Sequence, residues 1–219
     1  EKLAGFALFC CARPRTDLVI EVREVRRAGD LQIKRLPCRI ESIEKAAPDV
    51  AIVRFKLPAN ERLQYLPGQY VDFLLKDGKR RSFSLATPPH DDKLLELHIR
   101  HVPGGLFTDA LFTQYKGREI LRLEGPLGSF YLREDTDKPI VFVAGGTGFA
   151  PIKAMIEHAL HHDLPREMVL YWGARAQADL YLPDLPGTWQ SAHRNFTFIP
   201  VLSEPRPEDA WQGRTGLVH

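Results

Sequence analysis

One stretch of the chain, residues 139–151, constrains the fold more than any other. It begins with a continuously apolar run from Pro139 to Ala144, which is typical of a strand buried on both faces of a sheet. The run leads directly into the glycine-rich segment Gly145–Pro151 and then into a predicted helix. Apolar residues recur along this helix with helical spacing, at Ile152, Met155, Ile156, Ala159 and Leu160. A strand, a glycine turn and a helix in this order predict the opening of a parallel, doubly wound sheet.

The glycine turn matches part of the dinucleotide-binding fingerprint G-x-G-x-x-G. Gly146 and Gly148 fit its first two glycines, whereas Pro151 takes the third place. Pro151 falls in the first turn of the helix, where a missing N–H is tolerated. The backbone of Gly145, Gly146 and Thr147 can still approach a pyrophosphate, so we expect a nucleotide site here. The alternative is a plain tight turn.

Two further strands, Met168–Trp172 and Phe196–Leu202, continue the parallel sheet. No carboxylate ends the first of them, where an NAD-specific site often places one for the ribose 2′-hydroxyl. Arg175 stands there instead and can meet a 2′-phosphate, unless it is an ordinary solvated loop charge. Three strands are few for this fold, so we expect further strand–helix units beyond His219.

Between residues 34 and 135 the pattern is all-β. Short apolar runs alternate with turn residues such as Pro67-Gly68 and Asp77-Gly78. Six such runs predict a closed antiparallel barrel, with strands at Leu36–Ile43, Val50–Lys56, Gln69–Leu75, Arg81–Ala86, Leu94–His101 and Glu119–Gly125.

The fourth barrel run carries the sequence Arg81-Ser82-Phe83-Ser84. In a strand, Arg81 and Phe83 share one face, and Ser82 and Ser84 share the other. A guanidinium, an aromatic ring and two hydroxyls suit a flat, phosphorylated ligand. The alternative is an ordinary barrel strand with a solvated basic edge.

A glycine pair, Gly104-Gly105, precedes a predicted helix that begins near Leu106-Phe107-Thr108. Free N–H groups at a helix N-terminus favour an anion. Most glycine pairs before helices are only turns, so this signal is weak by itself.

The composition excludes several classes of protein. Of 219 residues, 44% are hydrophobic and 26% are charged, which is typical of a folded globular chain rather than a disordered one. A net charge of +2 is too small to indicate nucleic-acid binding, and no run reaches the roughly 18–20 apolar residues of a membrane span. Three cysteines, two of them adjacent, form no disulfide framework, so we expect a cytoplasmic protein.

Three histidines, His158, His161 and His162, lie on the helix after the glycine turn. Their spacing allows the side chains to converge. A metal site needs a further ligand and partners that orient the imidazoles, and the sequence reveals neither. A solvated helix face is therefore the favoured interpretation.

Five motifs, taken together and in order, resemble the ferredoxin–NADP reductase superfamily. They are Arg81–Ser84, His98–Arg100, Gly105–Thr108, Gly125–Gly128 and Gly145–Pro151. The likeness covers nearly the whole chain and is closest to ferredoxin-fused reductases such as CDP-6-deoxy-Δ3,4-glucoseen reductase and oxygenase reductase components. It implies a flavin-binding barrel, with FAD favoured over FMN, followed by an NAD(P)H-binding α/β domain. The implied activity is hydride transfer from nicotinamide C4 to flavin N5, followed by single-electron transfer to an iron–sulfur centre or partner protein.

The resemblance also assigns roles to residues. Arg81 matches the phosphate-binding arginine, Phe83 replaces the usual tyrosine beside the isoalloxazine, and Ser84 matches the hydroxyl near flavin N5. The remaining matches are His98, Ile99 and Arg100 on the ribityl side, Gly105–Thr108 at the pyrophosphate, and Gly146–Gly148 at NAD(P)H.

Two other functions fit the same motifs. One is a flavin reductase that releases reduced flavin, and the other is a non-catalytic electron-transfer subunit that keeps the flavin but not NAD(P)H. The intact glycine turn at Gly145 argues against the second.

The first 33 residues resemble the end of a plant-type [2Fe–2S] ferredoxin domain. Cys10 takes the place of its fourth ligand, and the other three ligands are absent, so this chain cannot hold a cluster. We therefore expect a ferredoxin remnant and linker at residues 1–33, a flavin barrel at 34–135, and a C-terminally incomplete nucleotide domain at 136–219. We further expect a longer native protein whose [2Fe–2S] domain accepts the electrons.

Overall fold

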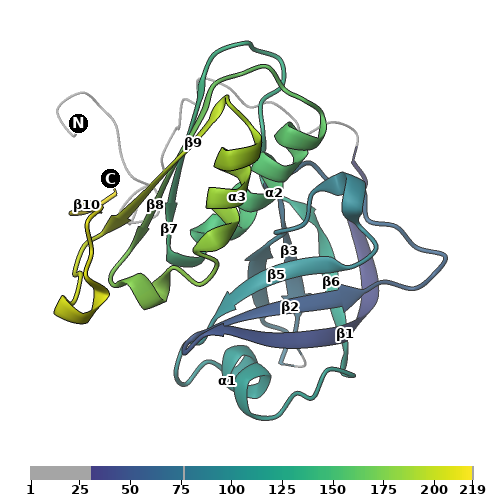
Figure 1. Ribbon diagram of the computed structural model, residues 1–219. Coiled ribbons are helices and arrows are strands. Elements are labelled where there is room, and N and C mark those ends of the chain that lie inside the picture. The colour runs from purple at the N-terminus through teal and green to yellow at the C-terminus, as the bar shows by residue number, and fades with distance from the viewer. Residues whose placement is uncertain (1–30, 76, 219) are drawn as a thin grey trace, which may run out of the picture.

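The computed structural model describes residues 31–75 and 77–218, which form two sheets that pack against each other (Figure 1). The first sheet is antiparallel with strand order β4-β3-β6-β1-β2-β5, and the second is parallel with order β10-β9-β8-β7. Cys10 and the rest of the ferredoxin-like segment up to residue 30 lie outside the described residues. Within the described part, no helix has the length and apolar character needed to cross a membrane.

The six-stranded sheet closes on itself and confirms the predicted barrel. Just beyond the end of β4, Leu85 pairs with Leu97 of β5, and the Ala86 N–H donates to the Glu96 carbonyl of β5 at 2.8 Å, so the two outer strands meet. The strands are β1 (Lys34–Ala47), β2 (Val50–Lys56), β3 (Tyr70–Leu74), β4 (Arg80–Ser84), β5 (Leu95–Arg100) and β6 (Ile120–Leu127).

Alternating apolar side chains fill the barrel. Leu36, Cys38 and Ile40 of β1 are buried, while the residues between them are exposed, as the two-residue period of a strand requires. Helix α1 (Leu106–Thr113) lies against one end of the barrel, where it adds Phe107 and Leu111 to the same core (Figure 1).

The parallel sheet begins with β7 (Ile140–Gly145) and continues with β8 (Met168–Ala174) and β9 (Phe196–Leu202). Helix α2 (Phe149–His161) connects β7 to β8, and α3 (Asp184–Ala192) connects β8 to β9. Both helices lie on the same side of the sheet (Figure 1) and contribute to one buried cluster. A fourth strand, β10 (Arg214–Thr215), pairs with β9 and is too short to show in a sequence pattern.

The apolar run of β7 is not buried on both faces, contrary to the expectation from its sequence. Phe142 and Ala144 face the helices and are only 5% and 1% exposed, whereas Val141 and Val143 are 63% and 48% exposed. The reason is that α2 and α3 cover a single face, and no other described residue buries these two valines.

The two sheets share apolar packing at their boundary. Ala47 and Val50, which flank the β1–β2 hairpin of the barrel, belong to the buried cluster that also contains Phe149 of α2 and Tyr181. The barrel is therefore held against the parallel sheet by its own core residues and not only by a linker.

Candidate functional site

The glycine turn lies where β7 ends and α2 begins, as predicted. Gly145 is the last residue of β7, Gly146–Gly148 form one 3₁₀ turn, and Pro151 is buried in the first turn of α2. Gly146 has a φ of +51°, a left-handed conformation that favours glycine. A Cβ at Gly145 or Gly148 would meet no atom within 4 Å, so the turn presents bare backbone to open space.

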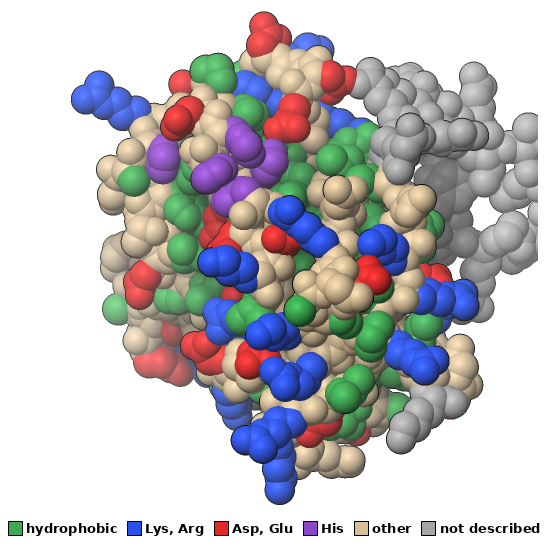
Figure 2. All heavy atoms as spheres, turned by 90° about the vertical axis from the view of Figure 1, so that its right-hand side faces the viewer, with side chains coloured by type: hydrophobic (Ala, Val, Ile, Leu, Met, Phe, Trp, Pro, Cys, Tyr) green, Lys and Arg blue, Asp and Glu red, His purple; other side chains and the backbone are tan. Residues whose placement is uncertain are grey.

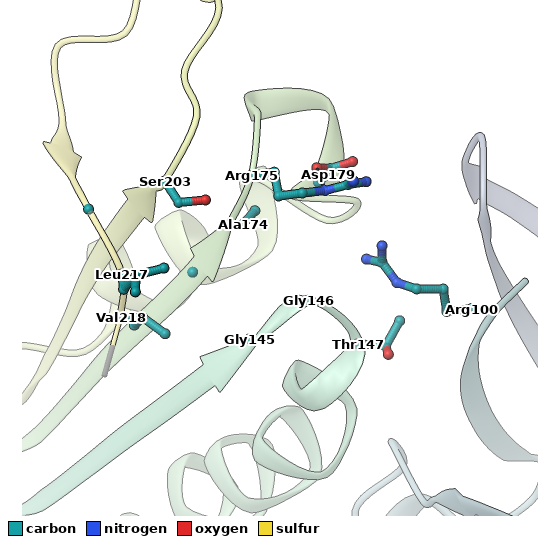
Figure 3. A pocket seen from close by; sticks show the side chains of 12 residues that line it. Arg100, Gly145, Gly146, Thr147, Ala174, Arg175, Asp179, Ser203, Leu217 and Val218 are labelled. Atoms are coloured by element: carbon teal, nitrogen blue, oxygen red, sulfur yellow. Dashed lines mark ion pairs between the residues drawn. The ribbon is translucent and has the colours of Figure 1, made fainter. Parts of the chain in front are cut away.

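A cavity of about 350 Å³ opens above this turn, between the ends of the parallel strands and the barrel (Figure 3). Open α/β sheets bind nucleotides at the carboxyl ends of their strands. Arg100 reaches the cavity from β5 of the barrel and is held by Asp49 Oδ2 at 2.8 Å. A Cβ on Gly146 would lie 3.1 Å from Arg100 Nη2. Both halves of the chain therefore line this site.

Arg175 lies at the cavity, but it does not stand there alone. It is 65% exposed at its side chain, and its Nε is 3.4 Å from Asp179 Oδ2 in the same cavity (Figure 3). This carboxylate is not among the predicted site residues, because a ribose-binding carboxylate is expected at the end of the strand itself. Asp179 follows four residues after Arg175, at the end of a 3₁₀ turn (Gln177–Asp179).

The strand β4 places its residues as the alternation predicts. Phe83 faces the barrel core, 6.0 Å between ring centroids from Phe73, whereas Ser82 faces outward and donates to Asp72 Oδ1 at 2.6 Å. Arg80, on the outward face, pairs with Glu124 and Asp72.

Arg81 differs from its neighbour Arg80. Its only hydrogen bond among the described residues runs to the Arg80 carbonyl, at 2.8 Å, and no described carboxylate lies within ion-pair distance. Arg81 therefore offers a free guanidinium beside the half-buried Phe83 and Ser84.

The turn before α1 lies close to this strand, because the rings of Phe107 and Phe83 are 5.3 Å apart. Gly104 has a φ of +79°, and Gly105 is the N-cap of α1. Thr108 is buried and its hydroxyl donates to the Val102 carbonyl at 2.9 Å. The side chains of Phe107 and Thr108 thus stabilise the fold, and the N–H groups of Gly104 and Gly105 donate to Asp109 Oδ2 and the Val102 carbonyl. The exposed Leu106 and the N–H groups at the start of α1 remain to face a ligand.

The three residues of the β5 motif separate in the structure. Ile99 is buried in the barrel core, Arg100 reaches the cavity, and the imidazole of His98 is completely buried at the boundary between the sheets. His98 Nδ1 lies 2.8 Å from Tyr181 Oη, and His98 Nε2 lies 3.1 Å from Glu96 Oε1. Side-chain contact with a ligand is therefore confined to Arg100.

Electrostatics fix the protons in this boundary network. Burial lowers the pKa of His98 and raises the pKa of Tyr181, so a neutral imidazole accepts from the tyrosine hydroxyl and donates to Glu96. Burial opposes ionisation of Glu96, but the His98 hydrogen bond and the charges of Lys153 and Arg54 outweigh it and lower the Glu96 pKa to about 2. Lys153 belongs to α2, 3.3 Å from Glu96, so a second polar contact joins the two halves.

The donor groups fit the two cofactors that the motifs predict. An unpaired guanidinium and a half-buried aromatic ring lie on β4, and the start of α1 packs beside that ring, which suits the phosphates and rings of FAD. Bare glycine backbone, two arginines and a cavity of about 350 Å³ meet above α2, which suits a nicotinamide nucleotide.

Comparison with known proteins agrees with this geometry. Residues 37–131 match the family described as "Oxidoreductase FAD-binding domain", and residues 142–219 match "Oxidoreductase NAD-binding domain". The crystal structure of the Amycolatopsis cytochrome P450 reductase GcoB superposes with a TM-score of 0.77 and 36% identity, over 99% of this chain and 65% of that one.

Two curated relatives are similar along nearly the whole chain. The CDP-6-deoxy-L-threo-D-glycero-4-hexulose-3-dehydrase reductase of Yersinia pseudotuberculosis is 40% identical over 98% of this chain. Reductase component 1 of the terephthalate 1,2-dioxygenase of Comamonas sp. is 38% identical over 94% of it. The chain spans 64% and 62% of the lengths of these relatives. It belongs to the ferredoxin reductase family, as an oxidoreductase whose FAD-binding barrel is joined to an NAD(P)H-binding sheet.

Proposed function

We propose that the protein is an NAD(P)H-dependent reductase that delivers electrons singly to an iron–sulfur centre or an acceptor protein. The observation that carries this proposal is the meeting of Arg100, from the barrel, with the glycine turn of the parallel sheet at one cavity. Bound FAD supplies the redox chemistry, in which a nicotinamide hydride enters and electrons leave one at a time. The protein residues bind, align and shield the two cofactors.

We assign the flavin to β4 and the turn before α1. Arg81 pairs with the phosphates, the backbone N–H groups of Leu106 and Phe107 at the start of α1 add donors, and the half-buried Phe83 supports the ring system. The Ser84 hydroxyl donates a hydrogen bond toward flavin N5 and orients it, without acting as an acid.

We assign NAD(P)H to the cavity above α2. The backbone of Gly145–Gly148 approaches its pyrophosphate, with Thr147 beside it. Arg175 favours a 2′-phosphate, and Asp179 favours a ribose 2′-hydroxyl. Because the two side chains pair with each other, we expect the site to accept both NADPH and NADH, with Arg175→Ala shifting the kcat/KM ratio toward NADH.

The flavin assignment is tested by comparing two adjacent arginines. Arg81→Ala removes a charge-assisted pair worth about 1.5–3 kcal/mol, so the FAD dissociation constant should rise about ten- to 150-fold. Arg80→Ala is the matched control, because Arg80 is already paired with Glu124 and Asp72 and should leave FAD affinity unchanged. Equal FAD affinity in Arg81→Ala and the wild type contradicts the assignment.

The activity is tested by stopped-flow reduction of the bound flavin. NADH or NADPH should bleach its absorbance, and one flavin per chain should remain bound after gel filtration.

We further propose cytoplasmic location and the division into a flavin domain at 34–135 and a nucleotide domain at 136–219. The division is supported by the gap between β6, which ends at Leu127, and β7, which begins at Ile140. The identity of the acceptor, a fused [2Fe–2S] domain or a separate protein, follows from which of them reoxidises the flavin.

A further inference from the structure

Four histidines gather in one patch on the surface (Figure 2), and none of them lines the cavity above α2. His158 and His161 lie in the last turn of α2, and His162 is the C-cap of that helix. The fourth, His90, comes from the barrel, in a 3₁₀ turn (Pro89–Asp91) between β4 and β5. The patch therefore joins both halves of the chain.

The ring nitrogens in this patch converge. One nitrogen from each of His90, His161 and His162 lies within 4.8 Å of the other two. The rings of His90 and His161 are stacked with centroids 3.7 Å apart. Tetrahedral coordination with Zn–N bonds of about 2.0–2.1 Å places ligand nitrogens about 3.3 Å apart. All three side chains are exposed, so rotation about their side-chain bonds can close the remaining gap.

His158 supplies a second and independent observation. Its Nε2 lies 3.0 Å from Glu134 Oε1, while its Nδ1 is buried and has no hydrogen-bond partner among the described residues. Its ring is 4.4 Å from that of His162. A carboxylate that accepts from one imidazole nitrogen leaves the lone pair of the other free, which is the arrangement that orients histidine ligands in metal sites.

We propose that His90, His161 and His162 bind a divalent transition-metal ion, with His158 as a fourth nitrogen ligand positioned by Glu134. An all-imidazole site suits Zn²⁺, Cu²⁺ and Ni²⁺ rather than Mg²⁺ or Ca²⁺, which prefer oxygen. The bound ion joins the barrel to the C-terminal end of α2, the helix whose N-terminal end carries the glycine turn. It therefore braces the orientation of the two halves.

Titration calorimetry with Zn²⁺ on tag-free, chelator-treated protein that retains its flavin tests the site. We expect one ion per chain, and an affinity at least about tenfold weaker in His90→Ala and in His161→Ala. His193→Ala, which removes a histidine outside the patch, is the control and should bind like the wild type. Absence of saturable binding, or full affinity in His90→Ala, overturns the proposal.

Three further measurements test the site, and the first of them separates a bridging site from chance binding to one helix. Zn²⁺ at about 100 times its dissociation constant should raise Tm by about 5–10 °C, and His90→Ala should abolish this rise. The EPR spectrum of bound Cu²⁺ should show coupling to imidazole nitrogens. The oxidised flavin is EPR-silent and does not interfere with this spectrum. Glu134→Gln should weaken binding about 10- to 100-fold without changing the stoichiometry. An affinity in Glu134→Gln equal to that of the wild type contradicts the positioning role.

Discussion

The hydrogen bond between Tyr181 and His98 should decide how firmly the two sheets are joined. Both residues are 5% exposed, and the bond between them spans 2.8 Å across the boundary. Tyr181→Phe removes the hydroxyl and leaves His98 Nδ1 buried without a donor. An unsatisfied buried acceptor costs about 1–3 kcal/mol, which for a chain of this size is a fall in Tm of about 2–12 °C.

The assay can follow each half separately. All three tryptophans, Trp172, Trp189 and Trp211, belong to the parallel-sheet half, so their fluorescence reports its unfolding, while flavin release reports the barrel. Tyr181→Phe should lower the urea midpoint of the tryptophan signal and also of the flavin signal, because the bond serves both halves.

Tyr65→Phe provides the matched control. Tyr65 is also buried, and its hydroxyl donates to the Thr87 carbonyl at 3.0 Å, within the barrel. This variant should lower the flavin midpoint more than the tryptophan midpoint. A change below about 0.5 kcal/mol in both signals of Tyr181→Phe refutes the reasoning, since that is the size of an ordinary surface effect.

Three other predictions follow from single residues. The folded-state pKa of Glu96 lies near 2, below its ordinary 4.5, so the ionised carboxylate stabilises the folded protein fully above pH 4.5 and this contribution is lost as the pH falls toward 2. The free energy of unfolding should fall by about 3 kcal/mol over this range. Urea unfolding of Glu96→Gln should show a flatter pH dependence. Gly146→Ala places a side chain at a φ of +51° and against Arg100, so NAD(P)H titrations should show weaker binding at unchanged flavin content. The control is Gly187→Ala, at an open position of α3, which should bind NAD(P)H like the wild type. Burial raises the pKa of the Cys38 thiol to about 12, so peptide mapping should find Cys38 unmodified by iodoacetamide at pH 8 until the protein is unfolded; modification in the native state contradicts this burial.

The local patterns were predictable because each depends on neighbours in sequence. The strand β7, the turn Gly145–Gly148 and the apolar stripe of α2 follow from periodicity and glycine chemistry, and the structure contains all three, although only one face of β7 is buried. The alternation along β4 likewise follows from the two-residue period of a strand.

Other features depended on contacts between distant segments. Asp179 enters the cavity through a turn after β8, Tyr181 reaches His98 from 83 residues away, and His90 meets the end of α2 from the barrel. The spacing of residues within one segment does not predict these contacts, because they depend on how the barrel packs against the parallel sheet. The sequence alone indicated which cofactors the two halves bind, through local glycine and arginine motifs and the family resemblance that those motifs carry in order. Only the tertiary structure decided which side chains face those sites and which, such as Phe107, Thr108 and His98, are buried to hold the fold together.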